Sequence, residues 1–406
     1  MLIFGNIKNK NIIYMKKISL EEAYISPYFE KYCKLDTLLE YDFYTKFNKE
    51  KYNFFIDPEN RRFKQADKEN VTFIISITVP GSQDLKNKKD APIFCKLTND
   101  YFKNKVDSYN KENNTYHSFF AVLPFNNPDD CLKELKRINS FNPPINRVLF
   151  NGPTSNGTKY DWLDDDKWNI LWDYANKNNT VFYVHPFVAK SYGNNTKDDS
   201  MEELIQNYPQ IISSQFAFHI NAAIFLLKLY IKNIFDNYKN IQWIAGHMGE
   251  TLTWFLYRFD HRTEIYKDQI KKIKKLKDIY VPKFNFMKFP KRSLSQLFQT
   301  QKGKKHAQVV CTTSGWFNTP ALKFAIEIVG VENILFSIDT PYENFNEALY
   351  WFNNIKLNKN DKSKIAWKNA NQILSIFPDK VKINTKKYSK ILKKNIKKSK
   401  KILKKS

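Results

Sequence analysis

Residues 241–250 read Ile-Gln-Trp-Ile-Ala-Gly-His-Met-Gly-Glu, and this stretch contains the pattern that decides the fold. An apolar run with the composition of a strand stops at His247, and the acidic Glu250 follows three residues later. Strands of parallel sheets have such continuous apolar runs, because helices cover both faces of the sheet. The stretch therefore predicts a buried parallel strand with functional groups at its carboxyl end.

Seven further runs share this composition, and segments long enough for helices separate them. The eight runs cover residues 17–22, 71–78, 118–123, 147–151, 181–185, 241–247, 308–314 and 333–339. Helices are predicted between them at 128–137, 164–176, 201–238, 320–329 and 344–352, and the Lys-rich segment 261–306 is predicted to be looped. Eight successive strand–helix units predict an α/β fold, a TIM (β/α)8 barrel with insertions.

The charge of the chain is unevenly distributed. Its 406 residues include 66 Lys and Arg against 41 Asp and Glu, a net charge of +25. Thirteen lysines lie between Lys380 and Lys405 without any acidic residue, which leaves +12 for the rest of the chain. We therefore predict an N-terminal extension at 1–15, the barrel at 16–378 and a Lys-rich tail at 379–406. The tail is interpreted as a solvated appendage with at most weak contact to polyanions such as RNA or an anionic membrane.

Composition excludes several classes of protein. Hydrophobic residues make up 42% of the chain and aromatic residues 16%, which excludes a disordered chain. No apolar run reaches the roughly 18 residues that a membrane span needs, and the first residues lack the apolar core of a secretory signal. The four cysteines form no CxxC pair, as is typical of reduced thiols. We expect a cytoplasmic protein without a transmembrane segment.

Polar groups follow the apolar runs at five places, where a TIM barrel has its active site. They include Glu21, His185, His247 with Glu250, and Asp339. Two imidazoles and two carboxylates at one barrel end are the composition of a divalent metal site. Each residue also has an ordinary interpretation: a lone His at a strand end is often structural, and Asp339 or Glu250 could cap the helix that follows.

Spacing along the chain suggests roles for the other candidate residues. The i,i+3 spacing of His247 and Glu250 predicts one helical face and an acid/base pair. Arg258 follows eleven residues after His247, on the next helix, where an Arg can bind a carboxylate bidentately. His219 lies in an apolar helical segment and is interpreted as a core histidine. The remaining histidines are interpreted as structural or exposed; they are His117, His261 and His306.

Motifs in this order resemble those of a known family. They are Leu20-Glu-Glu-Ala-Tyr, Val79-Pro-Gly-Ser-Gln, Phe120-Ala-Val-Leu-Pro, Val184-His-Pro, Gly246-His-Met-Gly-Glu, Thr313-Ser-Gly and Phe336-Ser-Ile-Asp-Thr-Pro-Tyr-Glu. Over roughly residues 16–378 the chain resembles the decarboxylase branch of the amidohydrolase superfamily. The resemblance is to the dihydroxybenzoate and gamma-resorcylate decarboxylases and to aminocarboxymuconate semialdehyde decarboxylase.

The resemblance implies a TIM barrel with one divalent metal ion, Mg, Mn or Zn, and no organic cofactor. It implies release of CO2 from a small aromatic carboxylic acid with ring hydroxyls, and a homo-oligomer. Metal ligands would be Glu21, His185 and Asp339. Many members have a His where this chain has Ala23, which favours oxygen-preferring Mg or Mn over Zn.

The resemblance also implies roles for the groups around the metal. Asp339 would deliver the proton, His247 with Glu250 would act as the acid/base pair, and Arg258 would bind the substrate. Tyr24 and Tyr342 adjoin ligand-bearing segments and are predicted to form substrate walls.

Two other functions stay open from the sequence. The metal of the same barrel could activate water, which would make the protein a hydrolase or hydratase. A catalytically silent barrel could instead act as a binding module, and such a protein would bind no stoichiometric divalent ion.

Overall fold

The computed structural model describes residues 15–33, 49–155, 160–187, 211, 214–275 and 289–378. The chain divides into a unit of residues 1–374 and a second unit of residues 375–406. The predicted Lys-rich tail and residues 1–14 lie outside the described residues, so the predicted domain boundaries stay predictions. Every described helix and strand belongs to the first unit.

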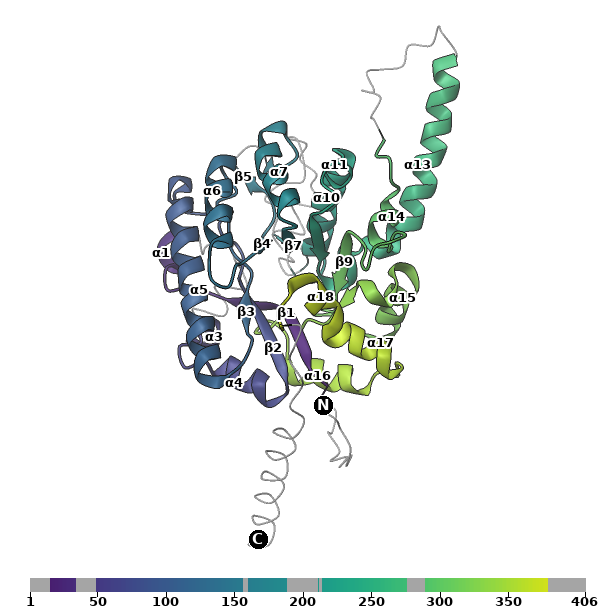
Figure 1. Cartoon of the computed structure of the whole chain (residues 1–406). Helices are drawn as coiled ribbons and strands as arrows, with labels where there is room; N and C mark the ends of the chain where they lie inside the picture. The colour runs from purple at the N-terminus through teal and green to yellow at the C-terminus, as the bar shows by residue number, and fades with distance from the viewer. Residues whose placement is uncertain are drawn as a thin grey trace. The chain divides into compact units, whose positions relative to one another are not determined.

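Each of the eight predicted apolar runs overlaps a strand, and these strands occupy the interior of the fold (Figure 1). They are β1 (Lys17–Tyr24), β2 (Val71–Ile77), β3 (Ser118–Phe119), β4 (Arg147–Phe150), β7 (Val181–Val184), β8 (Gln242–Ala245), β9 (Val309–Thr312) and β10 (Ile334–Leu335). A small antiparallel pair, β5 (Thr154–Ser155) and β6 (Tyr160–Asp161), lies outside this set.

All pairings among the eight strands are parallel. One sheet has the order β1-β2-β3 and the other β10-β9-β8-β7-β4. Two isolated parallel bridges join them, Ala121 to Val148 beside β3 and β4, and Glu22 to Thr340 beside β1 and the segment after β10. The strand order therefore runs from β1 through the strands in sequence and back to β1, as in the predicted TIM barrel.

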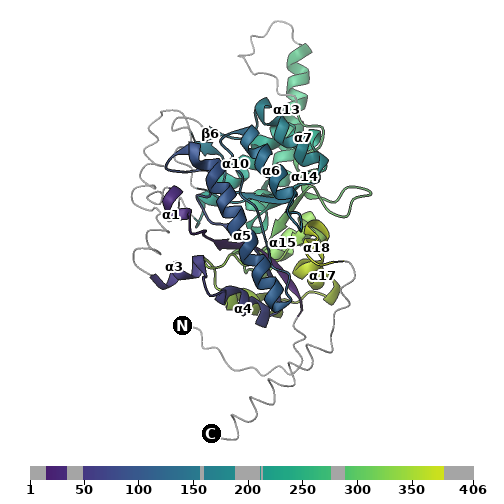
Figure 2. The same cartoon turned by 60° about the vertical axis from the view of Figure 1, so that its left-hand side comes forward.

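Helices flank the strands. Figure 2 shows α5 and α6 crossing in front of them. The helices are α1 (Phe29–Tyr32), α3 (Lys49–Ile56), α4 (Arg61–Lys68), α5 (Ala91–Asn113), α6 (Pro128–Asn139), α7 (Asn169–Lys177), α10 (Ala217–Ile231), α11 (Ile234–Asn237), α12 (His247–Glu250), α13 (Leu252–Lys275), α14 (Leu294–Phe298), α15 (Thr319–Val329), α16 (Phe345–Asn354), α17 (Lys359–Ser363) and α18 (Asn369–Leu374). Among these, the predicted helices at 128–137, 320–329 and 344–352 are confirmed as α6, α15 and α16.

Local sequence explains where α6 begins. The Asn127 side chain accepts hydrogen bonds from the backbone N–H groups of Asp129 and Asp130, and Pro128 occupies the first turn. Acidic residues in the first turn and Lys136 with Arg137 in the last turn match the helix dipole. One face of this helix is buried, and its residues Cys131, Leu135 and Ile138 belong to the hydrophobic core.

The prediction of a loop over 261–306 is wrong in part. Residues 261–275 continue α13, a helix of 24 residues, and residues 294–298 form α14. The prediction read the many lysines as a sign of a loop. In the structure, Glu264 and Asp268 each pair with a lysine three residues later, and such pairs stabilise an exposed helix. The described part of 201–238 consists of α10 and α11. Within the described ranges, no helix is long and apolar enough to cross a membrane.

The eighth strand–helix unit supplies a stability test. Phe352 on α16 is fully buried, and its ring centroid lies 4.7 Å from that of Phe336, which follows β10. Phe352→Ala should lower the free energy of unfolding by roughly 3–5 kcal/mol, because it leaves a cavity between helix and strand. The measurement is urea denaturation followed by circular dichroism.

Tyr350→Ala is the matched control, since Tyr350 lies on the same helix with 62% of its surface exposed. It should change the free energy of unfolding by no more than about 0.5 kcal/mol. Equal losses in the two variants would contradict this packing of α16.

Candidate active site

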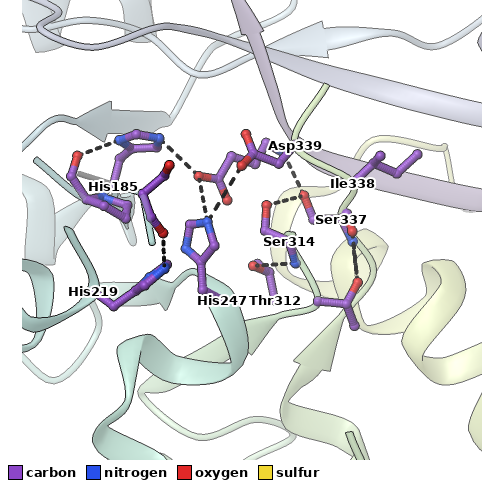
Figure 3. Close-up of polar contacts among 12 residues, drawn as sticks. His185, His219, His247, Thr312, Ser314, Ser337, Ile338 and Asp339 are labelled. Atoms are coloured by element: carbon purple, nitrogen blue, oxygen red, sulfur yellow. Dashed lines mark hydrogen bonds and ion pairs between the residues drawn. The ribbon is translucent and has the colours of Figure 1, made fainter. Parts of the chain in front are cut away.

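The candidate site lies where the strands end, as the sequence predicts. His185 directly follows β7, His247 follows Gly246 at the end of β8, and Asp339 lies four residues after β10. Figure 3 shows His185, His247 and Asp339 converging from these separate segments. The strand-end location of these residues is thus confirmed.

Glu21 reaches the same place through an irregularity in β1. Between Ser19 and Glu22 this strand advances three residues while β2 advances from Phe73 to Ile75, so β1 contains a bulge. A bulge re-aims the side chains beside it. β1 continues to Tyr24, so Glu21 and Glu22 lie within the strand rather than at its end.

Four side chains form the centre of the site. The Glu21 Oε1 atom lies 3.1 Å from His185 Nε2 and 3.9 Å from His247 Nε2. The Asp339 Oδ2 atom lies 3.7 Å from the same His247 nitrogen. Ligand atoms of Glu21, His247 and Asp339 all lie within 4.8 Å of one another, close enough to hold one metal ion. We name these four residues the carboxylate–imidazole cluster.

The tautomer of His185 fits a metal ligand. Its Nδ1 atom lies 2.7 Å from the Pro186 carbonyl oxygen, which can only accept, so Nδ1 carries the proton. In a neutral ring the Nε2 lone pair then faces the carboxylate oxygen of Glu21. Two lone pairs that face each other need a cation or a proton between them.

The cluster also contains buried oxygens without a hydrogen-bond partner. Among the described residues, Glu21 Oε1 and Asp339 Oδ1 lack one. A buried carboxylate oxygen without a partner is costly unless a cation is bound there. The donor set of imidazole nitrogens and carboxylate oxygens therefore fits a divalent metal ion.

Burial and the neighbouring charges shift the pKa values of Asp339 and Glu21 in opposite directions. Burial and the nearby Glu21 raise the pKa of Asp339 to about 8. Burial alone would also raise the pKa of Glu21, but His247 and His185 hold that pKa down at about 2. Without a cation, two carboxylates this close cannot both ionise readily, so the second keeps a proton.

His247 and Glu250 are paired, but not on a helical face. The His247 Nδ1–H donates to Glu250 Oε1 at 2.8 Å, so the two side chains are in contact, and their acid/base role stays a prediction. The segment His247–Thr251 has positive φ angles throughout, so it is a left-handed turn, and the right-handed helix begins only at Leu252. The turn is held by Gly246, whose carbonyl accepts from Gly249 and Glu250.

The backbone at position 246 leaves no space for a side chain, which explains the glycine there. A Cβ atom there would lie 2.5 Å from Glu250 Oε1 and 3.2 Å from the Tyr183 hydroxyl oxygen. The strand can therefore approach the buried carboxylate only with glycine at this position.

His219 belongs to the site, although its apolar helix suggested a core histidine. Its Nδ1 atom lies 3.0 Å from Glu250 Oε2, and its ring centroid lies 4.6 Å from that of His247. The sequence signal was present: His219 and Asn221 are the two polar residues in the first eleven positions of α10, and both are buried. His219, His247 and Glu250 form a second group that could hold a metal ion.

Tyr183 is a site residue that the sequence motifs do not single out. Its hydroxyl donates to Glu21 Oε2 and lies 3.1 Å from Thr312 Oγ1. Tyr183 is an aromatic residue inside an apolar strand, a pattern that predicts only core packing. In the structure it fixes the second oxygen of the Glu21 carboxylate.

A cavity of about 290 Å³ opens onto the cluster. Its lining includes ionisable side chains of the site and apolar or aromatic side chains. The first are His185, His219, His247 and Asp339, and the second are Val79, Pro186, Phe218, Trp316 and Tyr342. Its size is near the lower end of ligand pockets, roughly 300–1,000 Å³. A larger hollow of about 580 Å³ lies among α13, α14 and α15. None of its lining residues belongs to either metal-capable group, so the smaller cavity is the candidate active site.

The structure does not bring every predicted substrate residue to this cavity. Tyr342 lines it, with its hydroxyl against Thr78 Oγ1. Tyr24 is fully buried elsewhere, stacked under the Arg62 guanidinium at 4.0 Å. Arg258 is exposed on α13 and does not line the cavity. The other histidines are placed as predicted: His117 is buried beside Asp67, His306 contacts Gln372 and His261 is exposed.

Comparisons with known proteins agree with this geometry. The family model described as amidohydrolase matches residues 119–376. Gamma-resorcylate decarboxylase of Polaromonas sp. is 27% identical over 329 residues, 79% of this chain and 88% of the relative.

Two solved structures are similar across most of the chain. That of 2,6-dihydroxybenzoate decarboxylase from Rhizobium has a TM-score of 0.70 and 26% identity, and the match covers 89% of this chain and 99% of that one. Dihydroxybenzoic acid decarboxylase from Polaromonas sp., with bound manganese and the inhibitor 2-nitroresorcinol, has a TM-score of 0.71 and 24% identity, over 91% and 100% of the chains.

The cluster predicts binding of one divalent ion. Glu21→Gln should weaken Mn²⁺ binding by more than the roughly 10–100-fold that loss of an outer partner costs, because a ligand oxygen and its charge are removed. Isothermal titration calorimetry measures this affinity.

Glu134→Gln serves as the control, because Glu134 is a buried carboxylate on α6 that binds Asn99 and Arg137. It belongs to neither group that could hold a metal ion. Its Mn²⁺ affinity should stay within about twofold of the unsubstituted protein. Equal Mn²⁺ affinity in both variants would show that Glu21 is not a ligand.

Proposed function

The chain belongs to the amidohydrolase family, and on this basis we propose that it is a metal-dependent, non-oxidative decarboxylase of a hydroxylated aromatic acid, with 2,6-dihydroxybenzoate as the first substrate to test. The observation that carries the proposal is the carboxylate–imidazole cluster at the base of a small cavity with aromatic walls. The named relatives, which are decarboxylases of this substrate class, support the same reaction.

Glu21, His185 and Asp339 would hold the metal ion, and the His247 imidazole beside them would stay available as an acid/base group. Two of these three ligands are carboxylates and only one is an imidazole, which favours oxygen-preferring Mn or Mg over Zn. When bound, the ion would supply Lewis-acid polarisation and a template for a carboxylate with a hydroxyl next to it on the ring. No organic cofactor is needed for this chemistry.

Asp339 would deliver the proton. In this reaction a proton moves from the Asp339 carboxyl to the ring carbon that carries the carboxylate, and aromaticity is lost. The bond to the carboxylate then breaks, its electron pair returns to the ring, and CO2 leaves. Asp339 ends as a carboxylate and takes a proton from water. Asp339 can do this because it lines the cavity that would hold the ring.

His247, Glu250 and His219 would act together on the phenolic oxygen. Glu250 accepts from the His247 Nδ1–H, and its other oxygen lies 3.0 Å from His219 Nδ1, so it holds the His247 ring in one orientation with Nδ1 protonated. The His247 Nε2 atom then faces the cavity beside Asp339. Positioned proton transfer of this kind contributes roughly 10²–10⁴-fold to the rate.

The walls of the cavity suit a single aromatic ring. Phe218, Trp316 and Tyr342 supply apolar and aromatic surface, and the volume of about 290 Å³ leaves little room for a larger ligand. Arg258 takes no part in this proposal within one chain, since it lies exposed on α13.

The proposal is tested by a substrate screen. The protein loaded with Mn²⁺, Mg²⁺ or Zn²⁺ is assayed for CO2 release from 2,6- and 2,3-dihydroxybenzoate, and for water addition to lactones and enol acids. Release of CO2 with ring hydroxyls intact is the expected result. Turnover of lactones or enol acids alone would establish a hydrolase or hydratase instead.

Asp339→Asn should lower kcat by roughly 10²–10⁴-fold at saturating Mn²⁺, because the amide cannot deliver a proton. The far-ultraviolet circular dichroism spectrum should not change, since the substitution preserves size. Glu343→Gln is the control: it alters a carboxylate that lines the same cavity but belongs to neither metal-capable group, and kcat should change far less. Near-normal turnover by Asp339→Asn would remove Asp339 from the mechanism.

A further inference from the structure

The seam between β1 and the segment after β10 holds two proposed metal ligands, yet it has little regular strand pairing. β10 ends at Leu335, and a single parallel bridge joins Glu22 to Thr340. Glu21 lies directly before the first of these residues and Asp339 directly before the second. The relative position of the two ligands therefore depends on contacts other than a ladder.

Side chains make those contacts. The Ser337 hydroxyl accepts from the backbone N–H of Glu21 at 2.9 Å, and the Ser19 hydroxyl accepts from the N–H of Ile338 at 2.9 Å. One backbone hydrogen bond, from the Ala23 N–H to the Thr340 carbonyl, measures 2.8 Å. These three hydrogen bonds join β1 to the segment after β10.

Arg62, on α4, spans the same seam from outside the barrel. Its side chain is 3% exposed, and its Nη1 donates to the Ala23 carbonyl at 2.6 Å. Its Nη2 donates to both the carbonyl and the hydroxyl oxygen of Thr340, each at 2.7 Å. The planar fork of a guanidinium can bind two strands at once in a fixed geometry, which an ammonium cannot do.

Glu22 completes the connection. Its carboxylate accepts from the hydroxyls of Ser19 and Thr340 and lies 3.7 Å from Arg62 Nη2. The Thr340 hydroxyl thus accepts from Arg62 and donates to Glu22. Arg62, Thr340 and Glu22 form a continuous buried network, which we name the seam clamp.

The backbone at Asp339 shows why a clamp is needed. Asp339 has φ of 84°, a region that side-chain-bearing residues rarely adopt. Such a conformation persists only where the surroundings hold it in place. Arg62 binds the residue that follows, Thr340, through both of its oxygens.

We propose that Arg62 is a positioning residue that sets the separation of the Glu21 and Asp339 carboxylates and thereby the affinity for the metal ion. The proposal rests on the metal site of the proposed function. Arg62 neither lines the cavity nor belongs to the cluster, so it would act through its contacts with Ala23, Thr340 and Glu22.

A second buried arginine provides a matched control. Arg147, at the start of β4, is 8% exposed and also binds backbone carbonyls, those of Phe119 and Leu374, and the Ser118 hydroxyl. Ser118 and Arg147 both begin their strands, so this arginine binds the end of the barrel opposite the cluster. Arg62 and Arg147 therefore have similar burial and bonding but differ in their distance from the metal site.

The experiment measures Mn²⁺ affinity from the EPR signal of unbound Mn²⁺, for the full chain and its variants, together with the melting temperature. Arg62→Lys should weaken Mn²⁺ binding roughly 10–100-fold, the usual cost of losing an outer partner of a metal ligand. Arg147→Lys should lower the melting temperature but leave Mn²⁺ affinity within about twofold.

A second pair of variants tests the clamp should Arg62→Lys fold poorly. Thr340→Val removes the hydroxyl between Arg62 and Glu22 while preserving size, and it should weaken Mn²⁺ binding; Thr340→Ser keeps the hydroxyl and should restore it. Unchanged Mn²⁺ affinity in Thr340→Val and Arg62→Lys, or an equal loss in Arg147→Lys, would overturn the role of Arg62. An unsubstituted protein that binds no Mn²⁺ would instead overturn the metal site itself.

Discussion

Two carboxylates that face two imidazoles across a small space are the constraint on which the rest of the site depends. Glu21 and Asp339 lie at the end of an apolar barrel, and each has an oxygen without a hydrogen-bond partner among the described residues. Such an arrangement is unfavourable unless a cation or protons occupy the space. The bulge in β1 and the left-handed turn after β8 accompany the approach of Glu21 and His247 to this point, and the proposed role of the seam clamp is to hold Asp339 beside them.

Much of the fold could be predicted from the sequence, because its signals are local. Continuous apolar runs mark strands buried on both faces, and each run that was predicted overlaps a parallel strand. The rule that barrel active sites lie at the carboxyl ends of strands then selects the polar residues that follow these runs. His185, His247 and Asp339 could be found in this way without any knowledge of distances.

The remaining features depend on directions in space that spacing along the chain does not determine. Tyr24 lies three residues from Glu21, and alternate residues of a strand face opposite sides, so Tyr24 shares the face of Glu22 and contacts Arg62. Arg258 follows the buried Leu256 by two positions on α13 and faces outward. His219 and Tyr183 join the site only through tertiary contacts with Glu250 and Glu21.

The central claim is that this cluster catalyses a metal-dependent loss of CO2, and one measurement on the unsubstituted protein tests it most directly. The protein is incubated with 2,6-dihydroxybenzoate carrying ¹³C in its carboxylate, before metal removal, after removal with a chelator, and after Mn²⁺ is restored. The account predicts labelled CO2 in the first and third samples and none in the second. Equal release of labelled CO2 from the metal-free protein, or none from a protein that holds stoichiometric Mn²⁺, would contradict it.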